Sequence, residues 1–470
     1  MQGIPLLVFS CIALYVCQKL LGFWRAVQSI QNHPGLRQLF SPPSLFGLLL
    51  PKIKYLNQGR NALFLDKHQV FVEAGWDIIS SITIYPNNRT ALLLADAAAI
   101  KRNNKLVWDE TLKIVNGLFE DVWKNQDVVH VDHCLDITLP IALFVIGVAG
   151  FGKTISWKED DVIPPGHSMT FKDALHTVTT HFYVKILVPS WAMGFTAKTR
   201  KTRQAFSELH LYMKKMVRER QNDEKVERDD LLSSLLAAND HDLDGSTLSE
   251  DELIGNIFIF LVAGHETTAH TLCFVFALLA LYQDEQEKLY QHIRSVVPKD
   301  REATYEDMPA LTYAMAVFYE TLRLYPAGAA VPKVSAEDTT LVAGNINDEK
   351  LTVPVPKGTP LTLSVAGVHY NPRYWEDPTS FKPARFLKDW PRDAFLPFSA
   401  GARACLGRKF FETEGIVTLT TLVSKYKITV KDEPQFAGET FEQRRERVLT
   451  IGFGLTLTPV RVPLTFTRRT

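Results

Sequence analysis

The chain has 470 residues, of which 46% are hydrophobic and 11% aromatic, so it can bury a large core. It carries 52 basic and 52 acidic residues, a formal net charge of zero. With no basic stripe or tail, this balance argues against a nucleic-acid-binding protein. The cysteines form no CxxC pair and no disulfide framework, which favours a reducing compartment. They are Cys11, Cys17, Cys134, Cys273 and Cys405.

The N-terminal segment is almost entirely apolar from Gly3 to Trp24, interrupted only by Gln18 and Lys19. At about 1.5 Å per residue, a helix of this length is just long enough to cross a bilayer. Arg25 follows directly and favours a cytoplasmic location for the rest of the chain. A cleaved signal peptide is the alternative, but the sequence lacks the basic start and the small-residue cleavage site that it needs. We therefore expect a transmembrane anchor over residues 1–24.

Residues 25–50 contain two proline-rich turns and are expected to form a connector, followed by the main domain over residues 51–470. Apolar runs on either side of Pro86 predict a strand, a turn and a strand between residues 76 and 94. Helical periodicity then dominates as far as Leu324, and short strand-like runs follow. We expect a mainly α fold with a small β portion. The predicted helices span 107–123, 138–148, 167–178 and 200–227, and the predicted later strands span 351–355 and 360–365.

A long helix is predicted from a capping box at residues 249–252 to about Tyr282, with no proline to stop it. Its centre, Ala263-Gly264-His265-Glu266-Thr267-Thr268, is poorly suited to a buried helix. Thr267 can hydrogen-bond to the carbonyl of Ala263, which opens the helix, and Glu266 can relay protons there. Gly264 would let a flat group approach the backbone. A glycine kink with an acid on the helix surface is the simpler alternative.

Glu320 and Arg323 stand three residues apart in an apolar helical segment, so they share a face and can pair. A buried ion pair needs further hydrogen bonds to offset the loss of solvation. Arg385, in Phe381-Lys382-Pro383-Ala384-Arg385-Phe386, can supply them. We expect a buried Glu-Arg-Arg cluster with a structural role.

The segment Phe398-Ser399-Ala400-Gly401-Ala402-Arg403-Ala404-Cys405-Leu406-Gly407 fits the pattern Phe-x-x-Gly-x-Arg-x-Cys-x-Gly at every fixed position. A helical stretch follows, so Cys405 stands where the positive end of a helix dipole favours a thiolate. Gly401 permits a tight turn before it. A buried structural cysteine beside a glycine turn is the alternative, but five fixed positions argue against it. Cys405 is the predicted metal ligand.

These motifs occur together in the order used by cytochrome P450 enzymes, and the chain resembles that family from Trp76 to Leu455. The anchor resembles the microsomal type, and segments such as 397–415 resemble fungal members. The resemblance implies a cytochrome P450 fold, one haem b, and Cys405 as the axial thiolate ligand of its iron. The other residues with an implied haem contact are Phe398, Gly401, Arg403, Gly407 and Lys333, and the implied proton-transfer pair is Glu266 and Thr267.

The resemblance also implies a monooxygenase that inserts one atom of dioxygen into a lipophilic small molecule, with electrons from NADPH through a cytochrome P450 reductase. Fungal secondary metabolism and a single-pass anchor in the endoplasmic reticulum, with the catalytic domain in the cytoplasm, fit this type. We expect substrate contacts near Phe258, Leu261, the 327–331 loop and the 452–455 turn, and reductase steering by basic residues around the cysteine loop. Two alternatives remain open: a reductase-independent isomerase or dehydratase, and an inactive remnant.

One part of the sequence departs from the family pattern. Family members have a long loop and a helix with a Trp-x-x-x-Arg motif after the first sheet, and that Trp and Arg contact a haem propionate. Here residues 96–101 are followed almost at once by Trp108, and Leu112 stands where the Arg would be. We infer that the loop and most of that helix are missing, either through an error in the gene model or splicing or through a real deletion.

Overall fold

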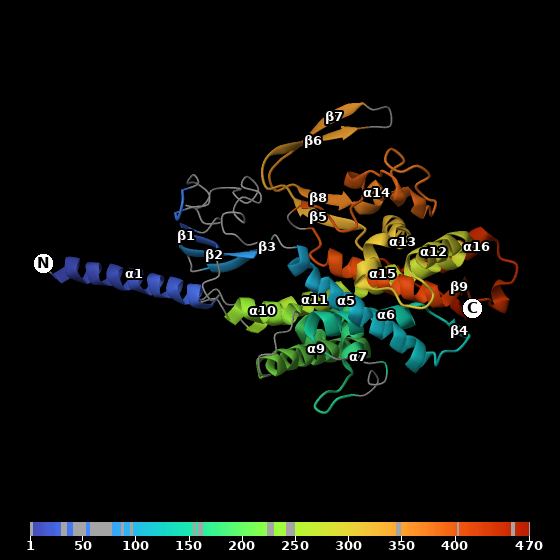
Figure 1. Ribbon diagram of the computed structural model, residues 1–470, viewed down its shortest axis with the longest axis horizontal. Coiled ribbons are helices and arrows are strands. Elements are labelled where there is room, and N and C mark those ends of the chain that lie inside the picture. The colour runs from blue at the N-terminus through green and yellow to red at the C-terminus, as the bar shows by residue number, and fades with distance from the viewer. Residues whose placement is uncertain are drawn as a thin grey trace. The chain divides into compact units, whose positions relative to one another are not determined.

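A computed structural model describes most of the chain (Figure 1). The chain divides into two compact units, and each contains helices and at least one small sheet. One unit comprises Met1–Asn103 and Val226–Gly255, and the other comprises Asn104–Lys225 and Asn256–Thr470. The described residues are 3–29, 35–40, 53–56, 78–85, 89–94, 97–153, 157, 163–222, 230–240, 250–344, 349–401, 404–452 and 456–469.

The first unit contains helix α1 (Gly3–Ser29) and a sheet of β1 (Gly35–Phe40), β2 (Ile78–Tyr85) and β3 (Arg89–Leu94). β2 pairs parallel with β1 and antiparallel with β3, which confirms the predicted strand-turn-strand. Helix α10 (Leu231–Asp240) also belongs to this unit. α1 confirms a helix over the apolar segment, and large apolar side chains on it stand about half exposed: Tyr15, Leu20, Leu21 and Trp24.

Among the helices whose side chains the structure describes along their whole length, α11 (Glu250–Leu281) alone is long and apolar enough to cross a membrane by length and composition. Two thirds of its most apolar window is buried inside the protein. Its apolar character therefore reflects a core position, since a helix buried on most sides is hydrophobic nearly all round.

The helices after β3 match the sequence prediction with shifted ends. α5 (Ala97–Gly117) starts ten residues earlier than predicted and runs into a π turn, η1 (Leu118–Val122). α6 (Leu135–Val145) likewise ends in a π turn, η2 (Ile146–Gly150). α7 (Phe171–Thr180) packs against α9 (Ala197–Asn222), where the Tyr212 hydroxyl donates to the Met169 carbonyl at 2.8 Å. Two short helices lie between them, α8 (Phe182–Leu187) and η3 (Ser190–Ala192).

The core of the second unit lies where α12 (Gln283–Val296), α13 (Thr312–Leu324) and α15 (Arg408–Lys425) pack together. α15 is buried on all sides from Phe411 to Val423. Short helices fill the connections: η4 (Tyr305–Ala310), α14 (Val365–His369), η5 (Pro383–Leu387), η6 (Arg392–Ala394), η8 (Pro434–Phe436) and α16 (Phe441–Val448).

The described strands of this unit form four small sheets, and β4 to β9 are labelled in Figure 1. The two predicted strands are confirmed as β7 (Lys350–Val355) and β8 (Pro360–Ser364), but each pairs with an earlier strand. β8 is antiparallel to β5 (Ala330–Val334), and β7 to β6 (Thr339–Gly344). The remaining sheets join β12 (Leu464–Arg468) to β4 (Val128–Val131) and β9 (Tyr426–Val430), and β10 (Ile451–Gly452) to β11 (Thr458–Pro459).

Gly415 allows α15 to pack against α13. A Cβ at this position would come within 2.5 Å of Phe318 Cε2 and closer still to Cζ, and Phe318 is fully buried. Gly415→Ala is therefore expected to destabilise the protein by about 1–3 kcal/mol, because an extra methyl group in a packed core forces its neighbours to move. Urea unfolding measures this. Gly255→Ala, with nothing within 4 Å, is the control and should cost nothing; equal effects would contradict the packing explanation.

Candidate active site

The cysteine loop folds as a tight turn immediately before α15. The Cys405 amide donates to the Phe398 carbonyl at 2.8 Å, and the Ala404 amide donates to the Gly401 carbonyl at 3.1 Å. Gly401 has a φ of +74°, which confirms the predicted turn, and Ser399 also has a positive φ, of +60°. Two backbone bonds thus fix Cys405 against the start of its own loop. Arg403 lies outside the described residues, so its propionate contact stays a prediction.

The surface at Cys405 and at the nearby Gly407 is open. Cys405 is exposed, and a Cβ added to Gly407, the N-cap of α15, would meet nothing within 4 Å. The Phe398 ring packs edge-on against Phe411, with centroids 5.6 Å apart. An accessible thiol beside a helix N-terminus can be stabilised as a thiolate, which is the form that binds metals. The loop therefore fits an axial ligand with room for a flat group over Gly407.

The centre of α11 is exposed to solvent along one face. Thr267 Oγ1 donates to the Ala263 carbonyl at 2.7 Å, as predicted, and Thr268 Oγ1 makes the same bond to Gly264 at 2.9 Å. Ile259 is 53% exposed, Ala263 is exposed and Thr267 is half-buried. These residues are four apart, so they form one stripe along the helix. A core helix with such a stripe offers a small, apolar surface beside a hydroxyl.

Part of the predicted substrate face of α11 lies in the core instead of at an open surface. Leu261 is fully buried in the core, and Phe258 is half-buried with its ring 6.3 Å from that of Phe206. Successive residues of a helix are rotated by about 100°, so Ile259 and Leu261 point in nearly opposite directions. Of the other predicted contacts, the 327–331 loop is partly exposed, and residues 453–455 lie outside the described chain.

Gly264 lies in close contact with a neighbouring element. A Cβ there would lie 3.1 Å from Ile146 Cδ1, so the glycine makes room for a side chain of η2. The approach of a flat group at this glycine stays a prediction.

Glu266 is buried, with 6% of its surface exposed. Its Oε2 has no hydrogen-bond partner among the described atoms, and burial raises its pKa from 4.5 to about 7. The adjacent His265 is also buried, and desolvation lowers its pKa to about 3, so this imidazole is neutral. A carboxyl group that titrates near neutrality can both hold and release a proton, as a proton relay requires.

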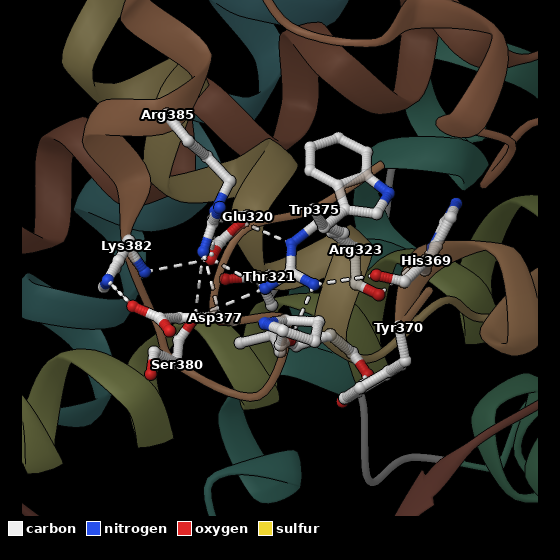
Figure 2. A network of polar contacts seen from close by, with 12 residues as sticks. Glu320, Thr321, Arg323, His369, Tyr370, Trp375, Asp377, Ser380, Lys382 and Arg385 are labelled. Atoms are coloured by element: carbon white, nitrogen blue, oxygen red, sulfur yellow. Dashed lines mark hydrogen bonds and ion pairs between the residues drawn. The ribbon is translucent and has the colours of Figure 1, made fainter. Parts of the chain in front are cut away.

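The predicted Glu-Arg-Arg cluster is present (Figure 2). Arg323 donates to both carboxylate oxygens of Glu320, from Nε at 2.8 Å and from Nη2 at 2.9 Å, and Arg385 Nε donates to Oε1 at 3.0 Å. The side chains of Glu320 and Arg323 are 0% exposed. Arg323 Nη1 also donates to the carbonyls of His369 and Pro378, at 2.9 and 2.8 Å. The additional hydrogen bonds needed to offset desolvation are therefore made.

Two residues of this region escaped the sequence analysis. His369 Nδ1 donates to the Arg323 carbonyl at 3.0 Å, and its Nε2 accepts from the Leu396 amide at 2.8 Å. It therefore links the buried cluster to the segment that enters the cysteine loop. Glu414 is fully buried in α15, and desolvation raises its pKa well above 4.5. The sequence could have indicated Glu414, because an acid within an apolar helical segment is unusual. No short pattern around His369 indicates its contacts.

The remaining predicted residues are less well defined. Lys333 lies half-buried on β5, opposite Leu361 of β8, and its propionate contact stays a prediction. Two of the basic residues near the cysteine loop are held by a buried acid: Arg408 Nε and Lys409 Nζ donate to Glu412 at 2.7 and 2.9 Å. They therefore have a structural partner of their own.

Trp108 is packed inside the second unit. It is fully buried in the continuous helix α5, its Nε1 donates to the Ala303 carbonyl at 3.2 Å, and its ring contacts Tyr305 edge-on. It is a core residue whose indole hydrogen bond connects α5 to the loop before η4. β3 is separated from α5 only by residues 95 and 96, so no long loop or additional helix stands between them.

Comparison with known proteins decides the family. The sequence profile of cytochrome P450 matches residues 102–447. The chain belongs to the cytochrome P450 family. It is 50% identical to cytochrome P450 monooxygenase 124 of Postia placenta, in an alignment that takes in 100% of both chains. It is 33% identical to the monooxygenase prx9 of Penicillium rubens, over 70% of this chain and 63% of that one. This P450 is thus a haem-thiolate monooxygenase of fungal type.

Two further comparisons bear on its fold and chemistry. A cytochrome P450 crystal structure superposes with a TM-score of 0.60 over 79% of this chain and 75% of that one, at 20% identity, which confirms the fold. Cyclooctat-9-en-7-ol 5-monooxygenase of Streptomyces melanosporofaciens is 33% identical over 55% of each chain. The alignment with the Postia protein runs over 521 positions. Because this P450 has 470 residues, it leaves some of those positions empty, as a missing segment requires.

Proposed function

We propose that this P450 oxygenates a lipophilic small molecule of fungal secondary metabolism at the open face of α11. The observation that supports this most directly is the stripe of Ile259, Ala263 and Thr267, which is apolar apart from one hydroxyl. Apolar surfaces with a few placed polar groups are typical of small-molecule sites. The Streptomyces relative acts, by its name, on cyclooctat-9-en-7-ol, and a substrate of comparable polarity would suit such a surface.

In this proposal the residues of the chain have separate tasks. Cys405 would bind the haem iron through its thiolate, and the backbone bond to Phe398 would hold the cysteine in position at the start of this loop. When bound, the haem supplies the activation of dioxygen. Glu266 holds a proton near neutral pH and Thr267 passes it toward the opened face of α11. Arg403 and Lys333 pair with the propionates.

The raised pKa of Glu266 makes stability depend on pH. Below pH 4.5 this carboxyl is protonated in the folded and in the unfolded chain and has no effect. As pH rises from 4.5 to about 7, the unfolded chain ionises first, so folding stability falls and stays reduced above about 7. Glu266→Gln is therefore expected to be more stable than the unsubstituted chain at alkaline pH, by about 1–3 kcal/mol, and equal to it at the acidic end. Urea unfolding as a function of pH measures this; a pH-independent difference would contradict it.

The missing Trp-x-x-x-Arg segment bears on whether the chain as it stands retains haem, because one propionate clamp is lost with it. The reduced, carbon-monoxide-bound absorption spectrum of the expressed 470-residue chain tests this. A far-red-shifted Soret band would show thiolate ligation without the clamp. An unshifted band, or no haem, would favour the inactive remnant. The pair Glu266-Thr267 argues against a reductase-independent isomerase or dehydratase, since such family members often lack it.

Membrane attachment and electron supply complete the proposal. The exposed apolar side chains of α1 support an anchor in the endoplasmic reticulum, with the catalytic domain in the cytoplasm. NADPH would then supply electrons through a reductase on the same membrane. Because Glu412 holds Arg408 and Lys409, the exposed Lys388 and Arg392 are the better candidates for steering an acidic reductase.

Reversing both charges, as Lys388→Glu with Arg392→Glu, is expected to slow reduction by the reductase about tenfold at low salt and much less at high salt, because screening weakens long-range attraction. Stopped-flow reduction kinetics at several ionic strengths measure this. Lys357→Glu, exposed on the β7–β8 turn, is the control. An unchanged rate in the double variant would show that these two residues do not contribute to the approach of the reductase.

A further inference from the structure

A second cavity lies in the same unit as the cysteine loop but at the other end of α15. It has a volume of about 400 Å³ and is formed by the end of α12, the loop of residues 297–303, the last turns of α15 and the end of β12. Thr420, which lines it, follows Cys405 by fifteen residues, and at about 1.5 Å per helical residue the two ends are well separated. This cavity is therefore distinct from the haem site.

Basic side chains dominate the lining. Six cations stand against two carboxylates, those of Asp300 and Glu302, among the residues that line the cavity. The cations are Arg294, Lys299, Arg301, Lys425, Arg468 and Arg469. Some are already compensated: Lys425 pairs with Glu302 at 3.0 Å, Arg301 with Asp307 at 2.6 Å and Arg469 with Glu287 at 3.1 Å. An excess of positive charge remains after these pairs.

Two of the arginines crowd the same ring. The guanidinium carbon of Arg469 lies 3.9 Å from the ring centroid of Tyr290, and that of Arg294 lies 5.5 Å from it. Arg294 donates to the Ser424 carbonyl at 3.1 Å and has no carboxylate partner in the part of the chain described. Two guanidinium groups are thus gathered at one side of the cavity, and of these two only Arg469 has a carboxylate partner among the described residues.

Three buried polar atoms of the lining also lack partners. Arg294 Nε, Arg469 Nε and Thr420 Oγ1 make no hydrogen bond to any described atom. A buried donor left unsatisfied costs free energy, and such groups usually mark a missing ligand or an ordered water. Here the two arginine nitrogens are obligatory donors, so the partner must accept. Both arginines line this cavity, whose excess of positive charge favours a negatively charged acceptor.

We propose that this cavity, the basic cavity, binds the phosphate or diphosphate group of a small molecule. Its volume is that of a small-ligand pocket, too small for a folded peptide segment. Guanidinium groups match phosphate oxygens geometrically, and Lys299 adds a further exposed charge at the rim. The bound group would join α12, α15 and β12, three elements that are far apart in the sequence. Either a free phosphorylated metabolite or the headgroup of an anionic phospholipid can present this chemistry.

Calorimetric titration of the purified full chain in detergent at low ionic strength tests the proposal, with inorganic pyrophosphate and dihexanoyl phosphatidic acid as probes. We expect saturable binding that weakens with added salt. Arg294→Gln should weaken it at least tenfold, because a charge-assisted bond is lost, and Lys299→Gln severalfold. Lys357→Gln, exposed and remote from the lining, is the matched control and should bind like the unsubstituted chain.

The two probes separate the two sources. Tighter binding of pyrophosphate points to a soluble phosphorylated molecule, and tighter binding of the lipid points to a headgroup; each supports phosphate recognition. Lys299 has an exposed side chain, so its variant remains informative if Arg294→Gln fails to fold. The proposal is overturned if neither probe binds, or if binding is equally strong in the lining variants and the control.

Discussion

Replacing Cys405 with serine is expected to abolish both the red-shifted reduced carbon-monoxide band and all oxygenase turnover. A serine hydroxyl stays protonated at neutral pH and does not supply the thiolate that binds and donates to the iron. The side chain is exposed at the start of α15, so the exchange opens no cavity and should leave the unfolding midpoint unchanged. The spectrum, the turnover rate and urea unfolding of the same preparation together measure the effect.

Cys17→Ser provides the matched control. Cys17 is also an exposed free cysteine, but it lies on α1 in the other unit. This variant should keep the band and the activity in full. A Cys405→Ser protein that still showed the red-shifted band would mean that another cysteine ligates the iron. If the unsubstituted chain takes up no haem during expression, the two variants should be compared after reconstitution with added haem.

Glu320→Gln is expected to destabilise the protein by about 3–5 kcal/mol, the largest effect on stability predicted for a single residue. The substitution keeps the shape of the side chain but removes its charge. Arg323, which is fully buried, and the largely buried Arg385 would then be left without their shared carboxylate. The amide also cannot accept at both oxygen positions, so the bonds from Arg323 Nη2 and the Lys382 amide, both to Oε1, cannot be kept together with that from Nε.

Urea unfolding again measures this, and an exposed pair gives the comparison. Lys113 pairs with Glu110 at 2.6 Å, also three residues apart on a helix, but the lysine side chain is 70% exposed. Lys113→Gln should cost less than about 1 kcal/mol, because the charge that is removed is exposed and water still reaches the partly exposed carboxylate of Glu110. Similar costs in the two variants would mean that the buried cluster contributes no more than an ordinary surface pair.

The sequence identified those parts of the site that depend on short, local patterns. The cysteine loop, the hydrogen bond from Thr267 to Ala263 and the pairing of Glu320 with Arg323 all involve residues within a few positions of each other. Backbone geometry and helical spacing therefore determine them almost completely. Arg385 was found as well, because a longer motif marked it in spite of its distance along the chain.

Features that depend on tertiary packing were not predictable in the same way. Which face of α11 is open depends on what packs against Leu261, and the neighbour of Gly264 is Ile146, more than a hundred residues earlier. The link through His369 joins a carbonyl of α13 to an amide near the cysteine loop. The basic cavity is assembled from four segments, none of which is unusual alone. Periodicity gives the faces of a helix, but it does not say which neighbour covers each face.

The direct passage from β3 into α5 has a consequence for protein engineering. Trp108 itself is joined to other parts of the second unit, through the indole bond to Ala303 and the edge contact with Tyr305. The boundary between the two units falls between Asn103 and Asn104, one turn before that anchor point. A restored loop and helix could therefore be grafted at this junction without disturbing the packing downstream. The segment inferred to be missing would be inserted there, ahead of the core packing at Trp108.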